Sequence, residues 1–221
     1  YWIISNFITL VITLIVNWMY PPRKFIDYEA LELSKVALAK SKALEKKLKP
    51  TAEQKAKAKA DYRRFFEEDN KKQIVFYSEK SGFYKYFKGV IEYILNNSDI
   101  VIHYVTSDPN DNILSMNNPQ LQAYYIDDKK LIVLFMKIET NMVVMTMPDL
   151  HNFHLKRSLV QKDIEYVYMF HGPVSTTMVL RKGALNYYDT IFCIGEFQID
   201  EIRQTEQHYQ LPEKNLVLCG Y

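Results

Sequence analysis

A histidine stands directly after an apolar run in the second half of the chain. Residues 166–170 are aromatic, β-branched or methionine, and His171-Gly172-Pro173 follows them. Such a run is typical of a buried parallel strand, and proline is well tolerated in the first turn of a helix. The pattern therefore predicts an imidazole at the carboxyl end of a strand, beside a helix start. There His171 could act as a general base, although a purely structural histidine is the simpler alternative.

The residues after this histidine favour contact with a ligand. Gly172 has no Cβ, so a ligand could approach the backbone closely at this point. Ser175 lies in the first turn of the expected helix, where backbone N–H groups attract phosphate. We therefore include Gly172 and Ser175 among the expected substrate- or phosphate-binding residues.

Two histidines, a lysine and an arginine lie close together after another apolar run. Residues 147–158 contain His151, His154, Lys156 and Arg157. Lysine and arginine are the side chains that bind phosphate, so we expect His154, Lys156 and Arg157 to contact phosphate. The two histidines could form a metal pair, but nothing nearby completes a site, and no metal is predicted. A solvated helix start is the alternative for Lys156 and Arg157.

Apolar runs alternating with helical patterns indicate an α/β fold. The expected strands cover residues 73–77, 100–105, 122–126, 142–147, 166–170, 190–194 and 216–218, with helices at 83–96, 129–138, 173–188 and 198–209. This alternation favours βαβ units in a Rossmann-like parallel sheet covered on both faces. The carboxyl ends of parallel strands meet at one edge, where the polar groups after the strands should gather. These are Ser78, Ser81, Asp108, the 149–157 loop, His171, Gly195 and Glu196.

The composition narrows the function further. The 221 residues carry a formal net charge of +2 and could form one sizeable domain. Cys193 and Cys219 lie in apolar runs, which predicts buried reduced thiols rather than a disulfide framework. Glycine-rich nucleotide fingerprints and zinc-type spacings are absent from the sequence. We expect no bound cofactor and no nucleic-acid partner.

Residues 1–20 contain no charged side chain and are dominated by isoleucine, leucine and valine. Twenty such residues in a helix would span the hydrocarbon core of a bilayer, about 30 Å thick. Arg23 and Lys24 follow, so the positive-inside rule would place the rest of the chain in the cytoplasm. We therefore expect a single-pass cell-membrane protein with its catalytic part cytoplasmic. A signal peptide and a buried core helix are the alternatives.

Residues 21–71 are rich in lysine, alanine, leucine and glutamate and predict two helices separated by Pro50. Thr51 and Gln54 have the spacing of a capping box that would start the second helix. Beside a membrane segment, such a basic helical hairpin would be attracted to anionic lipid. A hairpin whose charges only keep it solvated is the alternative.

Four groups of residues resemble landmarks of the CDP-glycerol glycerophosphotransferase family of teichoic-acid enzymes, and the similarity as a whole extends over about residues 73–221. The groups are Pro148-Asp149-Leu150 with His154-Leu155-Lys156-Arg157-Ser158; Phe170-His171-Gly172-Pro173; Tyr187-Tyr188-Asp189 with Ile194-Gly195-Glu196-Phe197-Gln198 and Glu201-Ile202-Arg203; and Leu211-Pro212-Glu213-Lys214 with Cys219-Gly220-Tyr221. Some polymerising members have Thr-Pro and lysine after His-Gly, whereas Pro173-Val174 follows here. This departure leaves the acceptor and the polymer length open.

The resemblance implies two Rossmann-like domains in the GT-B arrangement, with residues 72–221 as the amino-terminal, acceptor-side domain. In that family the chain continues into a domain that binds the CDP-alcohol, so we expect the donor domain to lie outside this sequence and these residues alone to be inactive. The resemblance also implies that His171 is the catalytic residue. We expect Gly195 and Glu196 to contact substrate as well. The implied partners are CDP-glycerol, or a similar CDP-alcohol, and a lipid-linked acceptor.

The preferred function is transfer of glycerol-phosphate, or a related polyol-phosphate, from the CDP-linked donor to the acceptor in cell-surface polymer synthesis. A nucleotide-sugar glycosyltransferase of capsule or glycolipid assembly is one alternative, because it can use the same scaffold. A membrane-anchored phosphate-binding module without catalysis is the other. The donor-binding domain would distinguish these functions.

Overall fold

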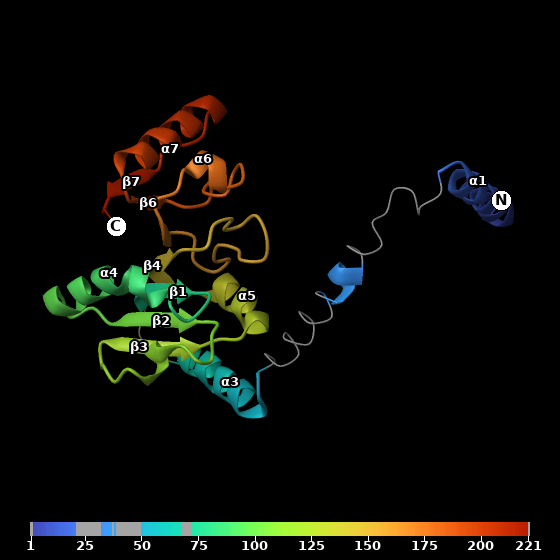
Figure 1. Cartoon of the computed structure of the whole chain (residues 1–221). Helices are drawn as coiled ribbons and strands as arrows, with labels where there is room; N and C mark the ends of the chain where they lie inside the picture. The colour runs from blue at the N-terminus through green and yellow to red at the C-terminus, as the bar shows by residue number, and fades with distance from the viewer. Residues whose placement is uncertain (1, 21–31, 37, 39–49, 68–71, 221) are drawn as a thin grey trace. The chain divides into compact units, whose positions relative to one another are not determined.

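A computed structural model describes residues 2–20, 32–36, 38, 50–67 and 72–220 (Figure 1). The chain divides into two compact units, Tyr1–Lys49 and Pro50–Tyr221. The second unit contains the sheet and every candidate site residue. Each unit is described separately below.

The first unit contains helix α1 (Trp2–Met19), whose apolar side chains from Ile4 onward are exposed. Within the described ranges, no helix has the length and apolar character needed to cross a bilayer. The expected membrane span over residues 1–20 is therefore not found.

The second helix of the predicted basic hairpin is found, and the hairpin itself stays a prediction. Residues 21–31 and 39–49, which include most of its first helix, lie outside the described residues. Helix α3 (Ala52–Glu67) begins with the predicted capping box: the Thr51 N–H donates to Gln54 Oε1 at 2.9 Å, and the Gln54 N–H donates to Thr51 Oγ1 at 3.2 Å. However, α3 packs against the sheet of the second unit, because Phe65 is buried in the core of that unit.

In the described part of the chain, seven parallel strands form one sheet with the order β3-β2-β1-β4-β5-β6-β7. This arrangement confirms the predicted Rossmann-like α/β fold, and each expected strand is found within about two residues of its place. The strands are β1 (Lys72–Ser78), β2 (Ile102–Thr106), β3 (Leu121–Tyr125), β4 (Thr140–Met145), β5 (Glu165–Met169), β6 (Thr190–Cys193) and β7 (Asn215–Leu218); the helices between them are α4 (Tyr84–Asn97), the 3-10 helix η2 (Asn112–Ser115), α5 (Asp128–Lys137), α6 (Thr176–Val179) and α7 (Glu196–Tyr209).

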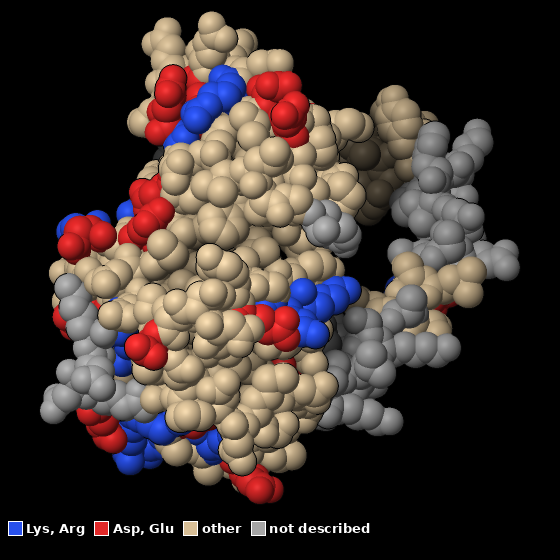
Figure 2. Space-filling model, turned by 90° about the vertical axis from the view of Figure 1, so that its left-hand side faces the viewer, with Lys and Arg blue, Asp and Glu red and all other residues tan. Residues whose placement is uncertain are grey.

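Both faces of the sheet are covered, as the apolar strands require. Alternation along β1 places Ile74 and Phe76 in the core beneath α4, and Val75 and Tyr77 in the core shared by α5 and α3. Figure 1 shows α4 and α5 on opposite sides of the sheet. On the face of the molecule in Figure 2, basic and acidic side chains lie in small mixed groups separated by uncharged surface.

Side chains of α3 cover the outer edge of the sheet at β3. Asp61 Oδ2 accepts from the Tyr125 N–H at 3.0 Å, and Arg64 donates to the Ala123 carbonyl oxygen at 2.5 Å. The Arg64 guanidinium also lies 4.2 Å from the centroid of the Tyr124 ring. The unpaired backbone groups of an edge strand are thus satisfied by two charged side chains.

The connections around β5 are irregular where a helix was expected. The helix predicted over 173–188 is wrong, because only the four-residue α6 forms there. Gly183 then turns the chain with φ +82°, and Tyr188 is buried with its hydroxyl donating to the Met147 carbonyl oxygen. A positive φ interrupts a right-handed helix, so the rest of the segment packs as turns.

The two cysteines differ in burial, and no disulfide joins them. Cys193 is buried as predicted, and burial raises the pKa of its thiol to about 11. Cys219 follows the edge strand β7 and is exposed, so the prediction of two buried thiols is wrong for this residue. Its Sγ donates to the Cys193 carbonyl oxygen at 3.3 Å.

A buried histidine in β2 predicts a pH-dependent stability. His103 is 4% exposed, and its Nδ1 lies 3.1 Å from the Tyr124 hydroxyl oxygen. Burial, and then the charges of Lys72 and Arg64, lower the pKa of His103 to about 4. An unfolded chain has an ordinary histidine pKa of about 6.5, so the unfolded state binds more protons between about pH 4 and pH 6.5. Stability should therefore rise with pH across this window and be lost as pH falls.

Urea unfolding of wild type and His103→Gln between about pH 4.5 and pH 7 measures this contribution. The free energy of unfolding should depend less steeply on pH in the variant than in wild type. The exposed His208 provides the control, since His208→Gln should keep the wild-type slope. Equal slopes for wild type and His103→Gln would contradict the assignment.

Candidate functional site

The strand order of the sheet reverses between β1 and β4, which continue in opposite directions to β2 and β5. In open α/β sheets, ligands bind outside the carboxyl ends of the strands at this point. The loop after β1 is tied to the loop after β2, because the Ser81 N–H donates to Asp108 Oδ2 at 3.0 Å and the Ser107 N–H to the Ser78 carbonyl oxygen at 3.1 Å. These polar residues therefore lie together at the expected edge.

His171 lies two residues beyond the end of β5, at the same carboxyl edge. In β5, Val167 belongs to the core beneath α4, and Met169 packs against that core. The imidazole of His171 is exposed, and its ring centroid lies 5.7 Å from the centroids of both Phe83 and Tyr86 at the start of α4. Two aromatic rings thus support the imidazole while solvent reaches it.

The residues after His171 join the loop after β5 to helix α7. Gly172 does not have a positive φ, and a Cβ built on it would meet nothing closer than a Val174 methyl at 3.9 Å. Ser175 is the N-cap of α6 and accepts from the Met178 N–H at 3.4 Å. The protein itself therefore gives no steric reason for glycine at 172, whereas Ser175 has a local capping role.

Two side chains of α7 hold the loop after β5 in place. The fully buried Gln198 donates to the Val174 carbonyl oxygen at 2.9 Å. Glu201 Oε2 accepts from the Thr176 N–H at 2.5 Å and from its hydroxyl at 2.8 Å. Burial opposes ionisation of Glu201, but the hydrogen bonds from Thr176 and Ser175 outweigh it and lower its pKa. The His171 loop is therefore fixed by two side-chain contacts to α7.

Gly195 and Glu196 lie at the amino end of α7. Gly195 is its N-cap, and a Cβ there would approach the Phe197 ring to 2.8 Å. Glu196 is exposed in the first turn, where a carboxylate stabilises the helix dipole. A second negative charge would be repelled at this position. The geometry thus gives Glu196 a helix-stabilising role, and its expected contact with substrate stays a prediction.

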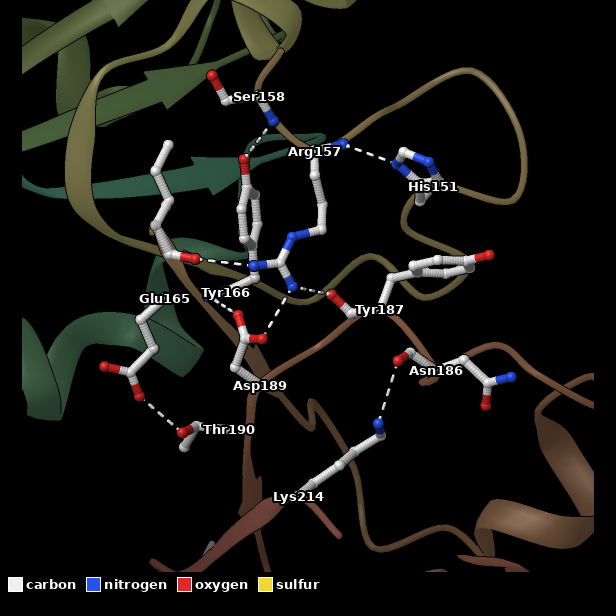
Figure 3. A network of polar contacts seen from close by, with 11 residues as sticks. His151, Arg157, Ser158, Glu165, Tyr166, Asn186, Tyr187, Asp189, Thr190 and Lys214 are labelled. Atoms are coloured by element: carbon white, nitrogen blue, oxygen red, sulfur yellow. Dashed lines mark hydrogen bonds and ion pairs between the residues drawn. The ribbon is translucent and has the colours of Figure 1, made fainter. Parts of the chain in front are cut away.

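The segment after β4 turns sharply around His151 (Figure 3). Asp149 and His151 have φ values of 65° and 67°. The His151 ring accepts from the Arg157 N–H at Nδ1 over 3.2 Å, and its carbonyl oxygen accepts from Lys156 Nζ at 2.7 Å. Burial, and then the charges of Lys156 and Arg157, lower the pKa of His151. Lys156 is thus used within its own loop, while His154 is exposed.

Arg157 is part of an internal network rather than an open anion site (Figure 3). Its guanidinium donates over 2.9 Å to each of three oxygens: the Tyr187 carbonyl, the Asp189 carboxylate and the Ile164 carbonyl. It also lies 4.5 Å from the centroid of the Tyr166 ring. These contacts engage both terminal nitrogens, so Arg157 holds the protein chain together.

The expectation that the 149–157 loop and His171 lie together at the carboxyl edge of the sheet is wrong for Arg157. Ile164 and Asp189 directly precede β5 and β6, so Arg157 lies at the amino-terminal edge of the sheet. His171 lies at the other edge, beyond the five residues of β5. At about 3.3 Å per residue, β5 alone separates them by roughly 17 Å. His171 and Arg157 therefore cannot contact the same phosphate.

Sequence reasoning missed the groups that position His171. Phe83, Tyr86, Gln198 and Glu201 stand far from it in sequence, and each reads alone as an ordinary helix residue. The aromatic pair has one usable signal, since it begins the helix after β1, where the Rossmann order places a ligand. Within the described ranges, no group of three His, Cys, Asp or Glu side chains could hold a metal ion.

The parallel sheet and the residues at its carboxyl edge define this protein as a Rossmann-like α/β protein with an exposed histidine after the fifth strand. Comparison of the chain with protein-family models, curated proteins and solved structures finds no match.

Proposed function

We propose that the second unit is the acceptor-side domain of a GT-B type transferase that moves glycerol-phosphate, or a related polyol-phosphate, from a CDP-linked donor to a hydroxyl of a lipid-linked acceptor. The reaction would take place at the cytoplasmic face of the cell membrane. The observation that carries the proposal is the exposed imidazole of His171, supported by Phe83 and Tyr86 at the carboxyl edge of the sheet. The resemblance of residues 73–221 to this family supports the choice of substrate.

In the proposed reaction His171 acts as the general base. The imidazole takes the proton of the acceptor hydroxyl as its oxygen attacks the β-phosphorus of the donor. A bond forms between this oxygen and the β-phosphorus, and the bond from the β-phosphorus to the bridging oxygen breaks. CMP leaves with that oxygen, and the imidazolium returns its proton to water. Lys85, whose Nζ lies 4.7 Å from the centroid of the Tyr86 ring, is a cation near the start of α4 that could offset phosphate charge.

A donor panel tests this function. The chain, alone and joined to any further residues its gene encodes, is incubated with an amphiphilic polyol-phosphate acceptor and CDP-glycerol, CDP-ribitol or a UDP-sugar. Acceptor-dependent release of CMP with the CDP-alcohols is expected from the joined protein, and none is expected from the 221 residues alone. Use of only the UDP-sugar would favour glycosyl transfer. Binding of the acceptor without turnover of any donor would favour a phosphate-binding module.

The substitution Gly172→Ala separates the fold from the chemistry. Because a Cβ at 172 would meet nothing closer than 3.9 Å, the free energy of unfolding should change by less than about 0.5 kcal/mol. If the acceptor passes over Gly172, the added methyl should displace it and lower kcat/KM about tenfold or more. Steady-state kinetics and urea unfolding measure the two effects.

Gly89 in α4 is the matched control, since a Cβ there would meet no atom within 4 Å. Gly89→Ala should leave kcat/KM unchanged and stabilise the helix by about 0.5–1 kcal/mol. Equal kinetics for wild type and Gly172→Ala would show that no substrate group approaches this backbone.

A further inference from the structure

A cavity of about 180 Å³ lies between α7 and the turns that follow α6. It is separate from Arg157 and His171, neither of which lines it. Its apolar wall comes from both segments: Leu180, Leu185, Ile202 and Leu211. A dry cavity of about 150 Å³ can hold a benzene molecule. The space is thus sufficient for a small organic ligand.

A buried ammonium group lines this cavity. Lys214 is 9% exposed, and its Nζ donates to the Asn186 carbonyl oxygen at 3.1 Å (Figure 3). Among the described residues, Lys214 Nζ makes this one hydrogen bond, and no carboxylate lies within ion-pair distance of Nζ. An ammonium has three N–H donors, and burying it without an anion is costly. Two of its donors thus remain for a ligand.

The carboxylate nearest in the fold does not neutralise this lysine. Glu206 is 4% exposed and lines the same cavity. Its Oε2 accepts from Arg203 at 2.6 Å, and its Oε1 accepts from the backbone N–H of Lys214 at 2.9 Å. Burial lowers the pKa of Lys214, while Glu206 and then Asp189 oppose this shift. The charge of Glu206 is thus matched by Arg203.

A second cation stands at the cavity. Lys182 lines it and holds its Nζ 3.8 Å from the centroid of the Tyr209 ring. Thr177 also lines this space, and its hydroxyl could donate a hydrogen bond to a ligand. The lining of the cavity thus combines apolar side chains with the ammonium groups of Lys182 and Lys214.

We propose that this cavity binds a small organic anion, with its phosphate or carboxylate group on Lys214 and an apolar body of about four or five carbons against Leu185 and Ile202. The site is independent of the proposed transfer reaction.

Binding of three probes to the full 221-residue chain tests the proposal by titration calorimetry and methyl NMR. Butyl phosphate and pentanoate share an anionic head and a short apolar body, whereas butanol lacks the charge. At least one anion should bind about tenfold or more tightly than butanol and shift the methyl signals of Leu185 and Ile202. The stronger of the two anions identifies the head group. Equal binding of butanol and both anions, or methyl shifts elsewhere only, would overturn the proposal.

Substitution of the lysine gives a second, independent measurement. Lys214→Met should weaken the anion about ten- to a hundredfold and leave butanol unchanged, and Lys214→Arg should retain most of the affinity. Lys162 is the control, because its Nζ also donates to a backbone carbonyl oxygen, that of Ser158, but the residue does not line the cavity. Lys162→Met and His171→Ala should both bind like wild type. Unchanged anion affinity in Lys214→Met would contradict the site.

Discussion

Replacing His171 with alanine should slow polyol-phosphate transfer about 10²–10⁴-fold, the usual contribution of a general acid–base group. The imidazole is exposed and packs against the rings of Phe83 and Tyr86. The free energy of unfolding should therefore change by less than about 1 kcal/mol. Initial rates, with urea unfolding alongside, measure both effects.

His208 is a matched control for this substitution. It is exposed, and its ring lies 4.5 Å from the centroid of the Tyr209 ring in the last turn of α7. His208→Ala should therefore transfer at the wild-type rate. A His171→Ala variant with near-normal turnover would remove the general base from the mechanism.

Replacing Arg157 with alanine should destabilise the second unit by about 2–4 kcal/mol, because three hydrogen bonds and a ring contact are lost and the carbonyl oxygen of the buried Ile164 is left unpaired. Asp189 would also lose the cation beside it while still accepting from the Tyr166 N–H at 2.8 Å. Arg157→Lys should recover only part of this loss, since lysine cannot reach all three oxygens. Urea unfolding of the three proteins at one pH measures these differences.

The ion pair of Arg181 with Asp149 is an exposed counterpart, which allows the contribution of Arg157 to stability to be compared. It donates to Asp149 at 3.0 Å, but its side chain is 68% exposed, against 24% for Arg157. Arg181→Ala should cost about 0–1 kcal/mol. If Arg157→Ala costs no more than Arg181→Ala but abolishes transfer, Arg157 contacts substrate, and the structural role assigned to it is wrong.

The strands could be predicted because burial on both faces leaves a continuous apolar run in the sequence. The structure of the segment after His171, where a helix was expected, could not be predicted in this way. Pro173 and Ser175 are good starting residues for a helix, yet it ends after one turn at the extended Leu180, and the turn at Gly183 and the burial of Tyr188 keep it from resuming. Tertiary packing decides whether such a segment forms a helix, and these contacts leave no periodic pattern in the sequence.

The candidate site was predictable only in part. The position of His171 followed from the end of a strand, which is a local signal. The role of Arg157 did not, because a guanidinium that binds phosphate and one that binds Asp189 and two carbonyl groups have the same sequence context. What separates them is the path of residues 149–158, which leaves the carboxyl edge after β4 and reaches the amino edge before β5. No local pattern encodes that path.

The cover that α3 provides for β3 has a consequence for how the protein is made. Asp61 and Tyr125 are 64 residues apart, so the helix leaves the ribosome well before the strand it must protect. Until the two meet, a newly made β3 can pair with the same strand of another chain, which is how edge strands begin to aggregate. A protease cut in the segment between α3 and β1 would free the helix to leave again. Self-association after such a cut is therefore the failure expected of this protein.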